Sequence, residues 1–453
     1  MTKPMREAVA PLYLLLCIVL GGSAQGIWEN MVLQLLGLVI LAWAAASRVS
    51  LLSRRGRQLL LLALLAVALV AIQVIPLPPS VWPRLGGREL VLEGHRILGI
   101  SSPWQPLSLA PYATLSAVLT LIPPLALLCA VSSLGAYRRS WLVASLLGGT
   151  IAAILLGAVQ VAAAGEASSS WYPYAQSSFG VATGFFANGN HMATLLVTAL
   201  PFLAALGASA RGADRQRYLA VAAMVGAAAL LIFVGIALNR SLAGYGLAPA
   251  VLAASVLILL PPRSSGRKAG AAISAVLLVA AVALLATSSV RGGTLRDDAG
   301  KSVQSRQEML STTATALRDY MPWGAGLGTF QSVYRLYEQP EKVTYLYANH
   351  AHNDYAELAL ETGVPGILLM LVFLIWWALA CRRAWTNPDA GSYAKAASIA
   401  SAAILAHSLV DFPLRTSAMA AVFAMCLAFL VERRASAVRS ASDLRPTRHI
   451  VIE

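Results

Sequence analysis

Long apolar runs recur from one end of this chain to the other, and they constrain its fold more than any other feature. Hydrophobic residues make up 58% of the 453 and charged residues only 12%, which excludes a soluble multidomain enzyme. The runs are continuous rather than alternating, and each is near the ~20 residues that an α-helix needs to cross ~30 Å of hydrocarbon. They fall at roughly 10–22, 31–46, 58–75, 112–134, 141–164, 190–207, 218–238, 242–261, 270–287, 363–381, 394–411 and 416–432. The sequence therefore predicts an all-α polytopic membrane protein with about twelve transmembrane helices.

Basic residues are distributed unevenly among the connecting loops. Alternate loops, counted with both ends of the chain, hold 22 of the 34 Lys and Arg residues. Because basic loops are retained on the cytoplasmic side of a membrane, we expect both termini to be cytoplasmic. The formal net charge of +14 then indicates a basic inner face beside anionic lipid headgroups, and no nucleic-acid partner is expected.

The first apolar run admits two interpretations. Lys3 and Arg6 precede it and Gly22-Ser23-Ala24 follows it, a pattern typical of cleaved signal peptides as well as of uncleaved first helices. We favour an uncleaved helix, because no large exported domain follows for a cleaved signal to deliver.

The cysteines lie within apolar runs and show no CxxC spacing. We expect buried free thiols rather than disulfides or a zinc site. They are Cys17, Cys129, Cys381 and Cys426.

Two segments on the predicted outer side are longer than turns. Residues 76–111 contain Trp82, Trp104 and several prolines, and we expect them to form an irregular cap on the outer leaflet. The large loop 288–362 lies between the ninth and tenth helices. Apolar side chains recur in it at spacings near three to four from Val303 to Tyr320, which predicts an amphipathic helix along the interface.

The large loop returns to the membrane through the polar, aromatic-rich stretch YLYANHAHNDY at 345–355. A neutral imidazole is well suited to accept a proton from a sugar hydroxyl near neutral pH, so His352 is a candidate base. The alternative is that Asn353 or Asp354 caps the following helix while His352 forms local hydrogen bonds. The residues alone leave both interpretations open.

A motif with fixed spacing then favours a functional role for His352. His352-Asn353, nine further residues and Gly363-Val364-Pro365-Gly366 give H-N-x9-G-x-x-G, which resembles the signature of the bacterial O-antigen ligase family and its relatives among repeat-unit polymerases. The resemblance covers about 185–415, and the first half of the chain is similar only in topology. Four further segments support it: Phe186–Asn190, Asn239–Ser241, Arg306 with Pro322–Gly328, and His407–Phe412.

The resemblance implies an inverting, metal-independent transfer of a glycan from undecaprenyl pyrophosphate to an acceptor hydroxyl, without a cofactor, at the periplasmic face of a bacterial inner membrane. His352 would be the base, and Arg240 and Arg306 would hold the pyrophosphate, because guanidinium forks bind phosphate oxygens bidentately. The alternative for Arg240 is an interfacial arginine that contacts lipid headgroups, and for Arg306 an ordinary surface charge.

Six further residues are expected to bind substrate. Their alternatives are helix caps, ion-paired struts and interhelical hydrogen bonds. His407 and Asp411 are spaced i, i+4 and therefore share a helix face near the outer end of the eleventh span. The six are Asn188, Asn190, His350, Asn353, Asp411 and Arg415.

No metal site is expected, because the carboxylates of the outer segments include no DxD pair of the kind that chelates Mg²⁺ or Mn²⁺. We expect three units. Residues 1–184 hold helices 1–5 with the outer loop 76–111, residues 185–432 form the ligase-like membrane region with the catalytic loop 288–362, and 433–453 is a basic cytoplasmic tail.

Ligase and polymerase differ in the acceptor, which is lipid A-core for the first and another lipid-linked repeat for the second. The sequence does not separate them, nor does it indicate the sugar, the linkage or the oligomeric state. A transporter or flippase of a lipid-linked substrate is the rival from another class. It predicts charges at the bilayer midplane, whereas the charged candidates here lie toward the outer face.

Overall fold

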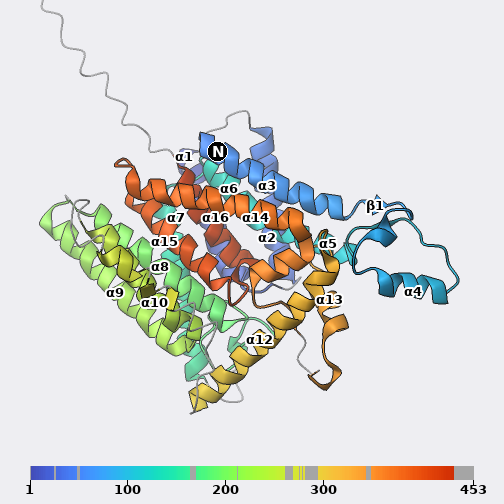
Figure 1. Ribbon diagram of the computed structural model, residues 1–453. Coiled ribbons are helices and arrows are strands. Elements are labelled where there is room, and N and C mark those ends of the chain that lie inside the picture. Colours follow the sequence, from blue (N-terminus) through green and yellow to red (C-terminus); the bar gives the residue numbers. More distant parts are fainter. Residues whose placement is uncertain are drawn as a thin grey trace, which may run out of the picture.

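The computed structural model describes residues 2–24, 27–47, 52–163, 170–211, 213–260, 269–274, 276–277, 279–280, 294–342 and 348–432. The structure is 75% helical with almost no strand, and it confirms the predicted all-α class (Figure 1). The ninth predicted span, 270–287, lies partly outside the described residues.

The residues that the structure describes up to Ala163 form seven α-helices, one short 3₁₀ turn and a pair of two-residue strands. The strands pair antiparallel within the predicted outer cap. In chain order these elements are α1 (Lys3–Leu20), α2 (Trp28–Ala46), α3 (Arg54–Gln73), β1 (Pro76–Leu77), η1 (Trp82–Arg84), α4 (Glu89–Ile97), β2 (Gln105–Pro106), α5 (Pro111–Thr120), α6 (Ile122–Ser132) and α7 (Arg139–Ala162).

The rest of the described chain is also helical. Its elements are α8 (Gly189–Ser209), α9 (Arg215–Asn239), α10 (Leu242–Leu259), α12 (Thr294–Tyr320), α13 (Phe330–Tyr337), η3 (Pro340–Lys342), α14 (Asp354–Thr386), α15 (Ser392–His407), η4 (Pro413–Arg415) and α16 (Ser417–Val431).

Eight helices among the described residues are long and apolar enough to cross a membrane. The chain is therefore a multi-pass membrane protein, and the number twelve stays a prediction. The eight are α2, α3, α5 with α6, α7, α8, α9, α10 and α14. Of the remaining helices, α15 and α16 are apolar but shorter than 18 residues.

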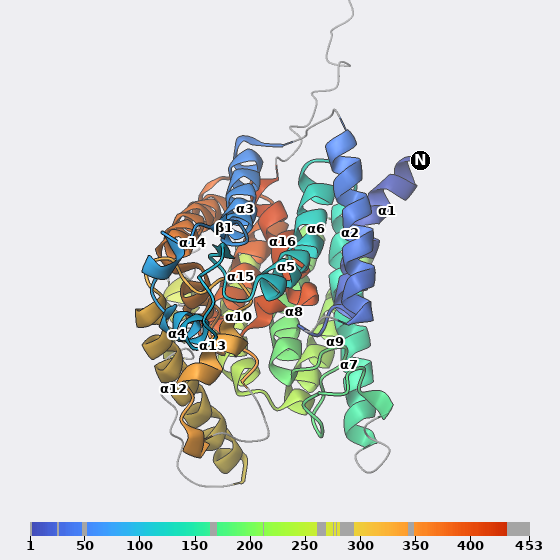
Figure 2. The same cartoon turned by 90° about the vertical axis from the view of Figure 1, so that its right-hand side faces the viewer.

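The loops gather at two ends of the helix bundle, as their charges predict. One cavity, of about 810 Å³, is lined by the starts of α3 and α7 and by the ends of α8, α14 and α16. A second, of about 730 Å³, is lined by the start of α8, the approach to α14 and the loop between α15 and α16. Since α8 contributes one end to each cavity and has 21 residues, roughly 30 Å separate them. Figure 2 shows the N-terminus at the end of the bundle away from α12.

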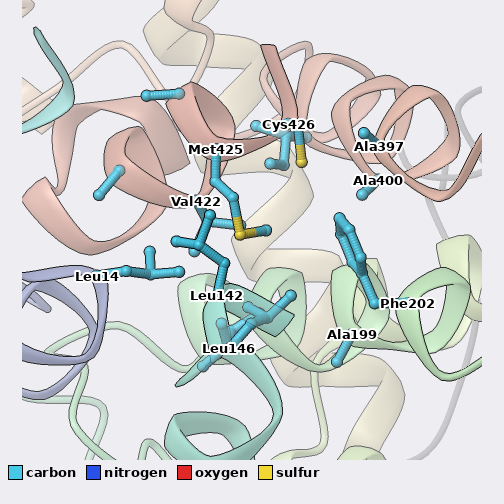
Figure 3. Close-up of a cluster of buried hydrophobic side chains, with 14 of the residues drawn as sticks. Leu14, Leu142, Leu146, Ala199, Phe202, Ala397, Ala400, Val422, Met425 and Cys426 are labelled. Carbon is cyan, nitrogen blue, oxygen red and sulfur yellow. The ribbon is translucent and has the colours of Figure 1, made fainter. Parts of the chain in front are cut away.

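The core forms where α8 meets α15 and α16. Helix α8 is the most buried of the candidate spans, and alanines line its contact with α15. Figure 3 shows Ala199 and Phe202 of α8 facing Ala397 and Ala400 of α15, beside Met425 of α16. Small side chains let helix backbones approach closely, which is the main source of packing energy between helices in lipid.

The four cysteines are free, as expected. Cys17 and Cys426 are buried, whereas Cys129 and Cys381 are only partly buried. The predicted amphipathic helix of the large loop is α12. One residue of its predicted apolar face, Leu310, is exposed instead, while Thr313 and Tyr320 are buried.

The glycine motif that begins at Gly363 holds the turn after α12 against the start of α14. Gly363 interrupts α14 with φ 60° and ψ −155°, which lets the Val364 N–H donate to the Pro322 carbonyl at 2.8 Å. On the other side, the Ala325 N–H donates to the Leu360 carbonyl at 2.9 Å. The turn that follows α12 is therefore fixed against the first two turns of α14, where the candidate site lies.

We predict that Gly363→Ala destabilises the protein by about 1–3 kcal/mol, the usual cost of a strained backbone conformation. A Cβ at Gly363 would lie 2.2 Å from the Pro322 carbonyl oxygen. The midpoint of thermal unfolding in detergent measures the effect. Gly148→Ala, where a Cβ meets nothing within 4 Å, is the matched control and should lower no midpoint. Equal midpoints for the two variants would contradict the steric argument.

Candidate functional site

A fully buried carboxylate, Asp411, lies at the centre of the site. It belongs to the loop between α15 and α16, and its surroundings come from four other parts of the chain. The side-chain groups nearest its two oxygens are Asn190 Nδ2 at 2.7 Å, Arg306 Nη2 at 3.4 Å, His352 Nδ1 at 3.4 Å, His191 Nε2 at 3.6 Å and His407 Nε2 at 4.0 Å. The backbone N–H of Phe412 also donates to Oδ1, at 2.9 Å. A single anion is thus surrounded by three imidazoles, a guanidinium and an amide.

Local hydrogen bonds fix the amide among these groups. Asn188 caps α8 by accepting a hydrogen bond from the Asn190 N–H at 2.8 Å. The Asn190 side chain donates to Asp411, while its Oδ1 accepts from the Ser241 hydroxyl at 2.8 Å. Asn188 therefore acts as a helix cap here, and Asn190 links α8, α10 and the Asp411 loop.

The position of His352 is set by the backbone on both sides of it. His352 has a left-handed φ of 49°, uncommon for a residue other than glycine. Asn353 caps α14 through the Ala356 N–H and donates to the Leu409 carbonyl at 2.9 Å, and the Asp354 N–H donates to the Ser408 carbonyl. The cap interpretation of Asn353 thus describes its contacts, and the cap holds the imidazole beside Asp411.

The charges around Asp411 control its ionisation. Burial alone would raise the pKa of the Asp411 carboxyl, but His352, the nearby His191 imidazole and the Arg306 guanidinium hold that pKa well below its usual range. Because the folded pKa is lowered, the ionised carboxyl stabilises the fold above the unfolded value of about 3.9. That contribution is lost only as the pH falls through the lower folded value.

A second cluster lies around Arg415, in η4. Three carboxylates of α14 face its guanidinium: Asp354 at 3.6 Å, Glu357 at 3.4 Å and Glu361 at 3.1 Å. Burial alone would lower the pKa of Arg415, but these carboxylates raise it above its usual value. With three acids against one arginine, this cluster carries a formal excess of negative charge.

Glu357 and Glu361 have further partners within the second cluster. Glu357 accepts hydrogen bonds from the Ala351 N–H and from His350 Nδ1, both at 2.8 Å. Glu361 Oε1 accepts from the Gly328 N–H at 2.8 Å. The carboxylates therefore fix His350 and the turn after α12 in place.

Phe412 separates the two clusters. Its ring centroid lies 4.4 Å from that of His350 and 4.9 Å from those of His191 and His352. All four side chains line the cavity of about 730 Å³, and Arg415 and Glu361 line it as well. The cavity thus offers imidazole edges, one aromatic face and both signs of charge to a ligand.

Arg240 is the predicted site residue that does not reach either cluster. It ends α9 with a left-handed φ of 56°, and its exposed guanidinium forms no ion pair with the described residues. The residues on either side of Arg240 hold it near the site. The Ser241 hydroxyl donates a hydrogen bond to Asn190, and the Asn239 side chain donates to the Gly189 carbonyl at 2.8 Å. Arg240 therefore lies at the rim of the site, with its side chain exposed.

The sequence did not single out four of the residues that build the site. His191 shares the alternatives of its neighbours Asn188 and Asn190 but was not kept as a candidate, and Phe412 was noted only as the end of the segment His407–Phe412. Glu357 and Glu361 follow Asp354 at i+3 and i+7, which places all three on one helix face and was a detectable pattern. Among the residues that the structure describes, no group of three or more His, Cys, Asp or Glu side chains is arranged to hold a metal ion.

The fold and the site define a multi-pass helical membrane protein with a buried, charged cavity at one end of its helix bundle. The family model described as O-Antigen ligase matches residues 227–371, a region that holds Arg240, Arg306, His350 and His352. The match confirms the resemblance predicted from the motif to the O-antigen ligase and polymerase superfamily, over about a third of the chain. A search of the curated proteins found no match to the chain.

We predict that Asp411 remains ionised at pH 5. Infrared spectra of the wild type minus Asp411→Asn should show no protonated carboxyl band that grows between pH 7 and pH 5. The lowered pKa of Asp411 is the reason. A protonated band that appears in this interval would show that burial outweighs the surrounding cations.

Arg415→Ala should destabilise the protein by about 3–5 kcal/mol, because it leaves the buried Glu357 and Glu361 and the largely buried Asp354 without their cation. The thermal unfolding midpoint again reports the loss. Arg318→Ala removes an exposed arginine from α12 and should have little effect. A midpoint for Arg415→Ala as high as that of the control would mean that the carboxylates need no cation.

Proposed function

We propose that this chain is an inverting, metal-independent glycosyltransferase that transfers a glycan from undecaprenyl pyrophosphate to an acceptor hydroxyl. The family match supports an O-antigen ligase or polymerase type of function in general. The observation that carries the finer proposal is the pairing of His352 with the buried carboxylate of Asp411 at the wall of the cavity.

His352 would be the base. With Nδ1 facing Asp411, the carboxylate favours the tautomer that keeps the proton on Nδ1 and leaves the Nε2 lone pair free. The 3.4 Å separation is longer than a strong hydrogen bond, as is common before substrate is bound. Nε2 would take the proton of the acceptor hydroxyl while its oxygen attacks the anomeric carbon. The bond from this carbon to the phosphate oxygen breaks, and the electron pair leaves with the pyrophosphate.

The distribution of charge indicates where the leaving group would lie. The Arg415 cluster offers no unpaired cation to a pyrophosphate, because three carboxylates already face its guanidinium. Arg306 approaches Asp411 through Nη2 alone, which leaves other N–H groups of its planar fork for phosphate oxygens. Arg240, which is exposed at the rim of the site, would also bind the pyrophosphate. The carboxylates and His350 on the other side of Phe412 suit the hydroxyl groups of a sugar.

The proposal extends to membrane placement. The cavity would face the periplasm and both termini the cytoplasm, because the basic loops gather at the other end of the bundle. Residues 185–432 would form the ligase-like unit, with residues 1–184 as its N-terminal partner. We propose lipid A-core as the acceptor, and a second lipid-linked repeat unit if the chain is a polymerase.

His352→Ala should lower glycan transfer by about 10²- to 10⁴-fold, the contribution typical of a positioned base. The assay supplies an undecaprenyl-pyrophosphate oligosaccharide and lipid A-core to purified protein without added metal. His95→Ala alters a histidine of the outer cap and serves as the control. Transfer at the parental rate by a well-expressed His352→Ala would refute the proposed base.

Arg306→Gln and Arg240→Gln should each lower transfer by about 10²-fold or more, as expected when a preorganised charge is removed. Arg318→Gln, twelve residues further along α12 than Arg306, is the matched control and should keep the parental rate. The same assay separates the other readings. Elongation of the donor alone would indicate a polymerase, and movement of unaltered donor across liposomes would indicate a transporter.

A further inference from the structure

A groove runs between α3 and α14 at the end of the bundle opposite the candidate site. The two helices lie side by side in both views (Figures 1 and 2). The cavity of the groove is about 520 Å³. Its apolar walls are Leu61 and Leu62 of α3 and Val372, Ile375, Trp376 and Leu379 of α14.

The apolar walls face away from the protein. Leu61, Val372, Ile375 and Leu379 are each more than half exposed, although they belong to helices that are apolar enough to span a membrane. Along α14, Val372 and Arg383 are eleven residues apart, roughly 16 Å of helix rise. The groove therefore has the length and the apolar lining to hold part of an acyl chain.

Three arginines close one end of the groove. Arg54 and Arg55 stand in the first turn of α3, and Arg383 stands in the last turn of α14. All three also line the polar cavity of about 810 Å³, which adjoins the groove. The guanidinium groups are thus placed where an apolar groove meets a polar space, the level at which the helices enter the membrane.

The described residues supply no acidic partner for these three arginines. Arg54, Arg55 and Arg383 form no ion pair with the described residues. Of the two acids that line the polar cavity, Glu432 already pairs with Arg139 at 2.8 Å. The chain after Glu432 adds five arginines against two acids, so its charge does not complement the arginines either.

We infer that this groove binds one anionic glycerophospholipid. Its phosphate contacts Arg54, Arg55 and Arg383, and one acyl chain lies along Leu61, Ile375 and Leu379. The guanidinium forks match phosphate oxygens, and each nearby basic residue attracts a negative headgroup. The bound lipid holds α3 against α14, the helix whose other end carries the carboxylates of the candidate site. The inference does not depend on the proposed reaction.

Native mass spectrometry of the full-length protein in neutral detergent tests the inference, with phosphatidylglycerol and phosphatidylcholine supplied in equal amounts. The wild type should retain one phosphatidylglycerol in preference. The triple variant Arg54→Gln, Arg55→Gln, Arg383→Gln should lose at least about tenfold of this binding. The triple control Arg57→Gln, Arg217→Gln, Arg382→Gln removes three charges outside the groove and should bind as the wild type does.

A second variant tests the proposed contact with the acyl chain without a change of charge. Ile375→Trp places a larger side chain in the groove and should also weaken the retention of phosphatidylglycerol. Three results would overturn the inference: no preference of the wild type for the anionic lipid, equal losses in both triple variants, or unchanged binding by Ile375→Trp. The second of these would mean general attraction by a basic surface.

Discussion

The burial of the Asp411 carboxylate is the constraint on which the site depends. An unpaired charge in so apolar a protein is very costly, so Asp411 needs partners that supply positive charge and hydrogen bonds. These partners come from the start of α8, the middle of α12, the approach to α14 and the end of α15. One anion thus brings together segments far apart in the sequence, and it does so at the place where the family motif begins.

Two clusters of opposite character result, and Phe412 lies between them. Around Asp411, one carboxylate faces an arginine and three imidazoles, whereas around Arg415 one arginine faces three carboxylates. Under the proposed function, this arrangement would orient a donor that carries negative charge at one end and neutral hydroxyl groups at the other. The same clusters are structural, because Glu361 and the backbone near Gly363 fix the turn after α12 against α14. Site and fold therefore share their polar contacts.

The sequence predicted most of the architecture because the apolar runs and the alternation of basic loops are physical requirements of a membrane. It also predicted the segment that carries His352 and the helix that carries Arg306. It could not predict which polar residues meet, because that depends on helix packing between distant segments. His191 was considered with Asn188 and Asn190 but not kept as a candidate, and Phe412 was noted only as the end of the segment His407–Phe412. Arg240 lies outside both charged clusters, with an exposed guanidinium. For Asn353, the helix-cap interpretation and the functional interpretation hold together. Its side chain caps α14, and this cap fixes the backbone of the neighbouring His352.

The central claim is that Asp411 acts through His352. A double-mutant cycle on single-turnover glycan transfer tests it most directly, with His352→Ala, Asp411→Asn and the combined variant compared with the wild type. Residues that act as one unit are strongly non-additive, so the combined variant should be no slower than His352→Ala alone. If the two losses multiply in the combined variant, Asp411 does not act through His352, and this account of the site is wrong.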